Sequence, residues 1–469
     1  MNDNVVLDGL DLRTGKPLVQ LHTGMMEAIK DRLGELLTRF RPAPQQPTGL
    51  KTGIDANNLE QAGWGVIFTS GADADHEIRN ALRSLLQHRK DQAKTRYKEY
   101  LDADGYRDGE SALEFLQRHR VTPGPVDPDQ VPYYLLIVAD PEAIPFKIQY
   151  ALDLQYAVGR IHFDSVTEYQ RYANGVVAAE TGGRPSPKRV AFFSSRFDLF
   201  TTSACDLLVK PLAKSVQASE WQVSTVLGDE ATKPALTKLL DGPSSPALLV
   251  TATHGVYCNP GDAEQKKLQP KLQGALACKQ KKEQELTLDL VFSGDDIPAD
   301  AHLPAMITFH CACYGAGTPR LNDFPAAKVV NPDEEDVPAT LADKAFVAHL
   351  PKRLLAHPNG GALAVIAHVE RAWTYSFLGA EADTRVQHFK DTLAAIMAGH
   401  TVGFAMCFLN KRYAEVYSRL DAALKRFKMG ELENALTLGA MWLAANDARD
   451  YVTVGDPAVR LSVSPPPAP

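Results

Sequence analysis

The sequence predicts an α/β fold in which helices flank a mostly parallel sheet, with a smaller α/β subdomain upstream and a helical arm at the N-terminus. Short runs of apolar and β-branched residues, typical of strands buried on both faces, recur along the chain. Helical or loop segments separate these runs, and such alternation predicts parallel strands joined by right-handed crossovers. The five strand candidates of the main domain are 189–195, 221–227, 247–253, 305–310 and 361–368.

Breaks in the apolar rhythm predict four parts. Leucines and other apolar residues spaced by three and four predict a helix over 17–40, and the proline-rich stretch 41–48 ends it. Glycine and proline without apolar rhythm at 181–187 mark the best domain boundary. The predicted parts are a helical arm (1–58), an upstream α/β subdomain (59–187), a main domain (188–463) and a disordered tail (464–469).

The upstream subdomain has its own alternation of strands and helices. Its predicted elements are a first strand over 63–70, a long charged helix over 75–100, a shorter helix over 108–118, strands ending at Asp140 and near Gly159, and a helix over 165–180.

Composition excludes some classes of partner. The 469 residues are 45% hydrophobic and 23% charged, which is ordinary for a globular protein, and the net charge of −7 disfavours general binding to nucleic acid or to an anionic membrane. The longest apolar stretches fall far short of the roughly 20 residues of a membrane-spanning helix. The first residues show no signal-peptide pattern and the six cysteines no disulfide spacing, so we expect a cytoplasmic protein with reduced thiols.

Two strand candidates each run into a reactive side chain next to a glycine. The segment ALLVTATHG ends in His254 and Gly255, and AMITFHCACYG carries Cys311 and Cys313. Groups just beyond the carboxyl ends of parallel strands often carry chemistry, so we expect His254 and Cys313 to lie side by side. Histidine moves protons near neutral pH, and a thiolate is a strong nucleophile. The pair predicts a cysteine–histidine protease site with an accessible thiol and no cofactor or metal.

This pattern resembles the caspase-like clan of cysteine peptidases, and the gingipain-like branch fits best. Segments 133–146 (YYLLIVADPEAIPF) and 156–161 (YAVGRI) are similar to that branch's upstream subdomain, and 454–461 (VGDPAVRL) is similar to its closing strand. The resemblance spans roughly residues 130 to 462. It implies a cysteine endopeptidase that cleaves protein or peptide substrates, and a bacterial stress or defence pathway. The 59 residues from His254 to Cys313 exceed a simple crossover and imply an insertion.

Residue types assign the remaining roles. Cys311 and Cys313 point to the same face of a strand, and Cys313 is favoured because the chain turns beside it and the family pattern puts the nucleophile after a small residue. Backbone N–H groups of Gly255 and Cys313 are the expected oxyanion hole. Asp140, Asp153 and Glu370 are each open as the group that orients His254. Asp198, Glu370 and Trp373 are weak candidates for the substrate pocket.

Charged loops suggest a specificity hypothesis and a simpler alternative. Lysines between 266 and 282 and an acidic run at 333–336 flank the two motifs. Such runs are usually solvated faces, but the acidic loop would also favour Lys or Arg before the scissile bond.

Three other functions compete with proteolysis. The segment 314–318 follows a strand as a phosphate loop would, yet it lacks the lysine and glycine spacing of one. Cys311 and Cys313 with His310 or His254 could ligate zinc, yet a second ligand pair is missing. A caspase-like scaffold without activity, or with a latent site that a partner orders through the N-terminal arm, is the remaining alternative.

Overall fold

The computed structural model describes most of the chain. The described residues are 10–12, 49–71, 73–121, 124–183, 186–217, 219–242, 245–279, 286–301, 303, 305–322, 340–377, 382–429 and 435–462. The predicted arm helix over 17–40, the acidic run at 333–336 and the tail 464–469 lie outside them.

One ten-stranded sheet runs through both predicted α/β parts. Every neighbouring pair is parallel except β15 with β16, which confirms the mostly parallel sheet. In spatial order the strands are β3 (Tyr97–Tyr100), β2 (Trp64–Ile67), β4 (Tyr134–Val138), β5 (Ala157–Ile161), β16 (Tyr451–Gly455), β15 (Ala364–His368), β12 (Ile307–Cys311), β8 (Leu248–Ala252), β6 (Arg189–Ser194) and β7 (Gln222–Leu227).

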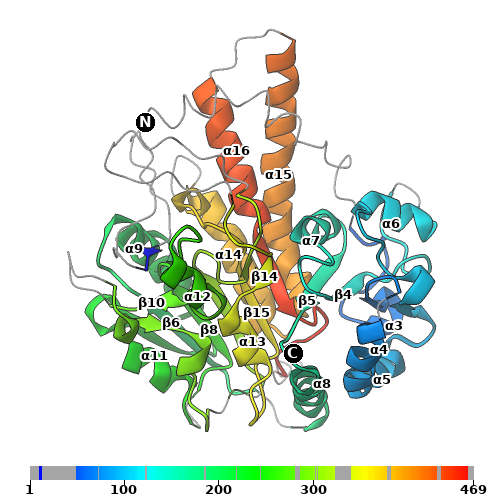
Figure 1. Cartoon of the computed structure of the whole chain (residues 1–469), viewed down its shortest axis with the longest axis horizontal. Helices are drawn as coiled ribbons and strands as arrows, with labels where there is room; N and C mark the ends of the chain where they lie inside the picture. Colours follow the sequence, from blue (N-terminus) through cyan, green and yellow to red (C-terminus); the bar gives the residue numbers. More distant parts are fainter. Residues whose placement is uncertain are drawn as a thin grey trace.

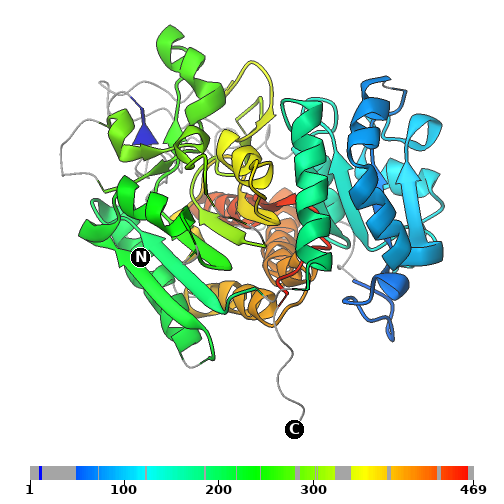
Figure 2. The same ribbon diagram turned by 90° about the horizontal axis from the view of Figure 1, so that it is seen from below.

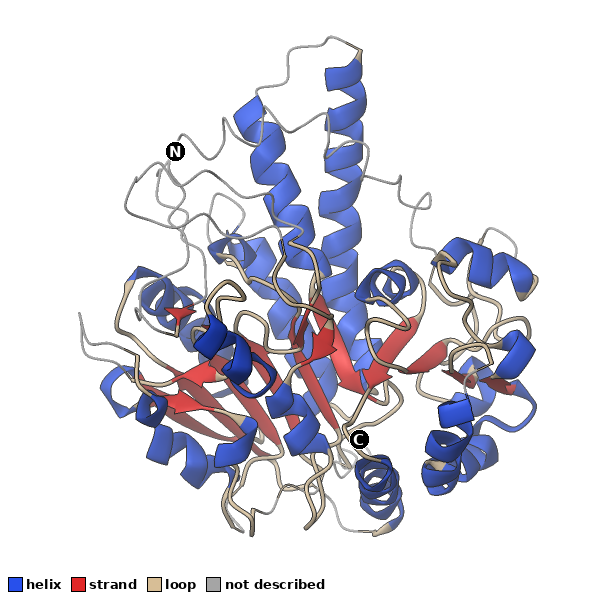
Figure 3. Ribbon diagram, viewed as in Figure 1, coloured by secondary structure: helices blue, strands red, loops and turns tan. Residues whose placement is uncertain are grey.

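Helices cover both faces of this sheet (Figure 3). They are α3 (Leu59–Ala62), α4 (Asp73–Ala81), α5 (Arg83–Ala93), α6 (Ala112–Arg118), α7 (Phe146–Asp153), α8 (Val166–Thr181), α9 (Leu199–Ser203), α10 (Lys210–Gln217), α11 (Lys233–Leu240), α12 (Ala263–Leu272), α13 (His349–Leu355), α14 (Ala382–Met397), α15 (Val402–Lys428) and α16 (Ala435–Arg449). Helices α15 and α16 form a hairpin that stands out from the body (Figure 1). Among the described helices, none combines the length and the hydropathy that a membrane span requires.

Two element predictions were wrong in their bounds. The helix predicted over 75–100 is interrupted after Ala81 and ends at Ala93, and the last residues of that range form edge strand β3 instead. Lys94 has a φ of 52°, which turns the chain out of the helix. The closing strand predicted from residue 454 is β16, which begins at Tyr451 and ends at Gly455; Pro457 then follows, and proline cannot donate to a ladder.

The halves of the sheet run in opposite directions because β16 is antiparallel to β15 and parallel to β5. The carboxyl ends of β8 and β12 therefore share one edge, while those of β4 and β5 lie at the other. The upstream part, blue and cyan in Figure 2, lies on one side of the molecule and the green and yellow part on the other. The predicted boundary at 187 stays a prediction, since the sheet continues across both parts.

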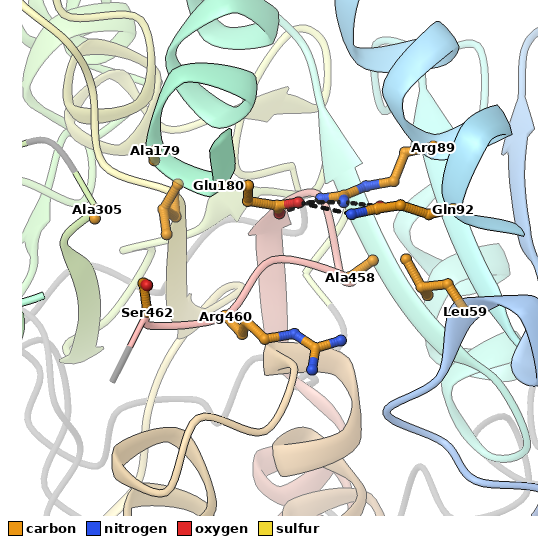
Figure 4. A pocket seen from close by; sticks show the side chains of 10 residues that line it. Leu59, Arg89, Gln92, Ala179, Glu180, Ala305, Ala458, Arg460 and Ser462 are labelled. Atoms are coloured by element: carbon orange, nitrogen blue, oxygen red, sulfur yellow. Dashed lines mark hydrogen bonds and ion pairs between the residues drawn. The ribbon is translucent and has the colours of Figure 1, made fainter. Parts of the chain in front are cut away.

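A buried guanidinium joins the two parts. Arg89 of α5 donates to Asp456, just after β16, at 2.6 Å and makes two hydrogen bonds of 2.7 Å to Glu180 of α8. Trp64 of β2 donates its indole N–H to the other Asp456 oxygen at 2.9 Å. Arg89 and Asp456 have no exposed surface. Arg89 and Glu180 also line a pocket of about 240 Å³, where Figure 4 shows them pointing toward each other.

Candidate active site

The register of the sheet brings the histidine and cysteine motifs together. Ala252 of β8 pairs with Cys311 of β12, so two residues further along His254 faces the position of Cys313. The backbones touch here: a Cβ on Gly255 would lie 1.8 Å from the Cys313 carbonyl oxygen and 2.9 Å from its nitrogen. Only glycine fits at position 255, because any side chain there would collide with backbone that cannot move aside.

His254 is held by an aspartate that follows the neighbouring strand. Its Nε2 lies 2.5 Å from Oδ2 of Asp198. The rings of Phe200 and Phe197 lie 5.0 and 5.7 Å from the imidazole, centre to centre. Because Nε2 contacts the carboxylate, proton transfer between His254 and a reacting group would use Nδ1.

Asp198 is itself fixed by the start of helix α9. As the N-cap residue it accepts hydrogen bonds from the Thr201 backbone N–H at 2.8 Å and hydroxyl at 2.7 Å, both through Oδ1. Burial alone would raise the pKa of the Asp198 carboxyl, but the His254 charge and these hydrogen bonds outweigh it and lower the pKa to about 2. Asp198 is therefore ionised across the physiological pH range and favours the protonated imidazole.

The Cys313 sulfur faces the segment that follows β15. The backbone N–H of Ala372 donates to the Cys313 sulfur at 3.0 Å. The buried guanidinium of Arg371 is close enough that attraction to Tyr314, Glu370 and Cys313 outweighs its burial and raises its pKa. The donated N–H and the nearby cation favour the thiolate, whereas the Ala372 carbonyl, 3.8 Å from the same sulfur, can accept from the thiol.

Cys311 has different surroundings. Its sulfur lies 3.2 Å from the hydroxyl of Tyr451, the first residue of β16, and both residues are buried. The assignment of Cys313 rather than Cys311 as nucleophile stays a prediction, and these contacts agree with it.

The expected accessibility of the thiol is wrong for this structure. His254 and Cys313 are both 0% exposed, as is Tyr314, whose ring stacks on Tyr257 at 5.9 Å. Apolar and aromatic side chains pack around the turn after β12 and cover the thiol, which the sequence had predicted to be accessible. Access for a polypeptide therefore requires part of this packing to move.

A strand from the N-terminal arm lies against the site. Strand β1 (Leu10–Asp11) pairs in parallel with β9 (Val256–Tyr257), directly after Gly255. Leu12 then packs into an apolar cluster with Val256 and Cys258, and Phe197 lies against the same cluster. In Figure 1 the blue arrow of β1 lies beside α9 among green elements, away from the other blue segments.

Of the other predicted site residues, two lie near the thiol and two lie elsewhere in the fold. Glu370, with a φ of 62°, and Trp373 are near the thiol but fully buried, so neither presents a surface to substrate in this conformation. Asp140 follows β4, whose carboxyl end lies at the opposite edge of the sheet from that of β8. Asp153 accepts from the Val158 N–H at 3.2 Å. The residue that orients His254 is instead Asp198, which sequence reasoning had offered only as a pocket wall.

Asp198 also lines an open pocket. The Asp198 side chain is 21% exposed, and the pocket beside it has a volume of about 790 Å³. Arg196, Lys210 and Asp229 supply its charged groups, and Phe197 and Leu227 supply apolar surface. This pocket brings solvent to the outer side of the aspartate–histidine pair.

The structure bears on two alternatives from the sequence, a zinc site and a solvated charged loop. Within the described ranges, no group of three or more His, Cys, Asp or Glu residues is arranged to hold a metal ion. Four of the lysines of the insertion, Lys266, Lys267, Lys271 and Lys279, form ion pairs at partly or largely exposed positions, as a solvated charged face would.

Comparisons with known proteins found a remote structural likeness. No family model matches the chain, and no curated protein matches it. A solved structure described as "Structure of Protease" is similar over 86% of this chain and 80% of that chain, with a TM-score of 0.48 and 11% sequence identity. A likeness this remote does not bear on function, so the site itself has to carry the functional argument.

Proposed function

We propose that this protein is a cysteine endopeptidase in which Cys313 is the nucleophile, His254 the proton carrier and Asp198 the residue that orients His254. The observation that carries the proposal is the contact between the two strand ends, together with the carboxylate that holds the imidazole. A nucleophile, a base and a group that orients the base, in this order, are the parts that acyl transfer requires.

The proposed reaction uses Cys313 as nucleophile and His254 first as acid and then as base. The Cys313 thiolate attacks the peptide carbonyl carbon, and the backbone N–H groups of Gly255 and Cys313 stabilise the oxyanion. The imidazolium of His254 gives its proton to the leaving amine, which breaks the C–N bond and leaves a thioester. Water, deprotonated by His254, then hydrolyses the thioester and releases the carboxylic acid.

The burial of the site supports a regulated enzyme. We infer that the closed packing is a latent state and that a protein partner acting through the N-terminal arm, or the arrival of substrate, opens it. We propose that the enzyme acts inside the cell, as the sequence predicts. Its proposed substrates and partner are proteins or peptides, not nucleic acid or membrane. The alternative function, a scaffold without catalytic activity, is supported by the same burial, because a site that never opens cannot turn over substrate.

Covalent labelling tests the proposal. A peptide acyloxymethyl ketone reacts with an activated thiol, and peptide mapping by mass spectrometry identifies the residue that carries the label. Label on Cys313 supports the peptidase, whereas absence of label under every condition that opens the site favours the scaffold.

We expect Asp198→Asn to lower the rate of peptide cleavage on the order of 10²-fold, the lower range for general acid–base effects. The amide keeps a hydrogen bond but removes the charge that favours imidazolium. The pKa of His254 falls as a result, and the alkaline limb of the pH–rate profile moves to lower pH. Because the pKa of Asp198 is depressed to about 2, its contribution to stability is present above the unfolded value of about 3.9 and is lost only as the pH falls toward 2.

The profile is measured with a fluorogenic peptide between pH 4 and 10. Asp206→Asn, which alters a carboxylate on the same helical segment that pairs with Lys210 at the surface, serves as the control. An unshifted alkaline limb in Asp198→Asn would remove Asp198 from the proposed site.

We expect Leu12→Asp to speed labelling of Cys313. Burying Leu12 stabilises the closed state by about 2 kcal/mol, and a carboxylate there would favour release of β1. An opening equilibrium shifted by that amount raises the labelling rate on the order of tenfold or more. The rate constant is compared with that of Leu113→Asp, a leucine that is 62% exposed on α6. Equal rates in both variants would show that β1 does not control access.

A further inference from the structure

A cluster of buried charges lies behind the segment that contacts the Cys313 sulfur. Asp447 of α16 is its centre and has no exposed surface. One carboxylate oxygen accepts from the Trp373 backbone N–H at 2.9 Å, and the other accepts from the Ser376 hydroxyl at 2.6 Å and from Arg412 of α15 at 2.9 Å. His368, at the end of β15, lies 3.6 Å from the first oxygen.

These contacts join α15, α16 and the end of β15 to one short segment. Trp373 and Ser376 belong to the stretch 370–376 that follows β15, while Asp447 and Arg412 come from the helical hairpin. Ala372, the residue before Trp373, donates its N–H to the Cys313 sulfur, and Arg371 is the residue before that. Because Asp447 binds both Trp373 and Ser376, it fixes the stretch at two points close to the thiol.

The backbone at this place needs such fixing. Glu370 has a φ of 62° and Tyr314 one of 58°, both unusual for residues other than glycine. The Tyr314 N–H donates to the Glu370 carbonyl at 2.5 Å, so the two turns hold each other. Strained turns persist only where surrounding contacts over-determine them, and the bonds to Asp447 are contacts of that kind.

We propose that Asp447 is a positioning residue, which holds the stretch 370–376 so that the Ala372 N–H meets the Cys313 sulfur. This inference rests on the proposed role of Cys313 as nucleophile. It assigns the helical hairpin a part in preparing the thiol, through a chain of contacts from α16 to the segment after β15.

The charges around the cluster keep Asp447 ionised. Burial would raise the pKa of Asp447, but the attraction of His368, 3.6 Å from the carboxylate, and of Arg412 outweighs it and lowers the pKa. Asp450 and Asp447 together raise the pKa of His368, against the effect of its burial. Charged or titratable groups that the structure describes near Cys313 include Arg371, Tyr314 and Glu370, with His254 opposite it after the neighbouring strand. A substitution at position 447 changes none of these residues.

The test is the pH dependence of alkylation of Cys313 by iodoacetamide, read by peptide mapping in the full-length protein. The midpoint of this profile reports the pKa of the thiol, whereas its plateau at high pH reports access to the sulfur. Asp447→Asn puts an amide NH₂ opposite either the Trp373 N–H or the Ser376 and Arg412 donors, so one anchor is lost. We expect the midpoint to rise by about one pH unit, which is a tenfold slower reaction on the acidic side.

Three comparisons make the result decisive. Asp456→Asn removes an equally buried carboxylate that pairs with an arginine far from the thiol, and its midpoint should match that of the unmodified protein. Ser376→Ala removes one anchor without touching a charge and should raise the midpoint by a smaller amount, which keeps the test open if Asp447→Asn does not fold. Cys311, alkylated in the same samples, reports general loosening.

An unmoved midpoint in folded Asp447→Asn, or in Ser376→Ala if only that variant folds, would overturn the proposal. So would an equal shift in Asp456→Asn. Because alkylation needs no peptide cleavage, failure of the positioning role is distinguishable from failure of the peptidase proposal, which would appear as absence of label from the peptide probe.

Discussion

Replacing Cys313 by alanine is expected to abolish labelling by a peptide acyloxymethyl ketone and to lower the rate of peptide cleavage by at least about 10⁴-fold. Loss of the nucleophile removes the covalent route entirely, and what remains is transition-state binding by the rest of the site. His254→Ala is expected to lose nearly as much, because members of one catalytic unit are strongly non-additive. Cleavage is followed with a fluorogenic peptide library, and labelling by intact mass.

Cys311→Ala is the matched control for this experiment. It removes a thiol two residues away on the same strand, whose sulfur contacts Tyr451 rather than Ala372. Its labelling should stay within a few-fold of the unmodified protein. Loss of label in Cys311→Ala but not in Cys313→Ala would transfer the nucleophile to Cys311. Label that persists in Cys313→Ala, Cys311→Ala and His254→Ala would return the protein to the class of binding modules.

Arg89→Leu is expected to lower the free energy of unfolding by about 3–5 kcal/mol, the range for breaking a buried ion pair. The leucine leaves Asp456 and Glu180 buried without the cation between them. Since these groups join α5 and α8 to the end of β16, the loss weakens the contact between the upstream part and the part that carries the site. Urea unfolding monitored by circular dichroism gives the change.

The control for Arg89→Leu is Arg79→Leu on the neighbouring helix. Arg79 pairs with Glu99 at a partly exposed position, and such pairs contribute about 0–1 kcal/mol. The charge of Arg89 also depresses the pKa of Glu180. That part of the stability is therefore present above the unfolded pKa of about 4.3 and is lost as the pH falls further, so the two variants should converge under strongly acidic conditions. Equal losses at neutral pH would contradict the argument.

Parts of the fold were predictable because their signals are local. Strands β4, β6, β8, β12 and β15 are short apolar runs between turn residues, and each lies within or next to a predicted range. The segment after residue 93 was not predictable from spacing, because charged residues continue through Tyr97–Tyr100 while their place at the edge of the sheet makes them a strand. The helical pattern of the preceding residues therefore ends there, and pairing with β2 makes the segment a strand.

In the candidate site, too, the local features could be predicted and the long-range contacts could not. The motifs around His254 and Cys313 predicted that two strand ends meet, and the register of β8 against β12 brings those positions opposite each other. Asp198 was found but given another role, because nothing in the sequence shows which way a carboxylate at a strand end points. Its position as the N-cap of α9 was the only sequence-level signal for a fixed orientation.

The alternation of strands and helices and the two reactive side chains could be predicted from local residue patterns, since both depend on residues close together in the chain. Long-range packing set the partner of His254, the closure of the thiol from solvent, and the convergence of Asp447, Trp373 and Ser376 behind it. The physical reason is that burial and hydrogen-bond partners arise from segments distant in sequence. A buried carboxylate has to be paired, but only the packing of the whole chain selects the residue with which it pairs.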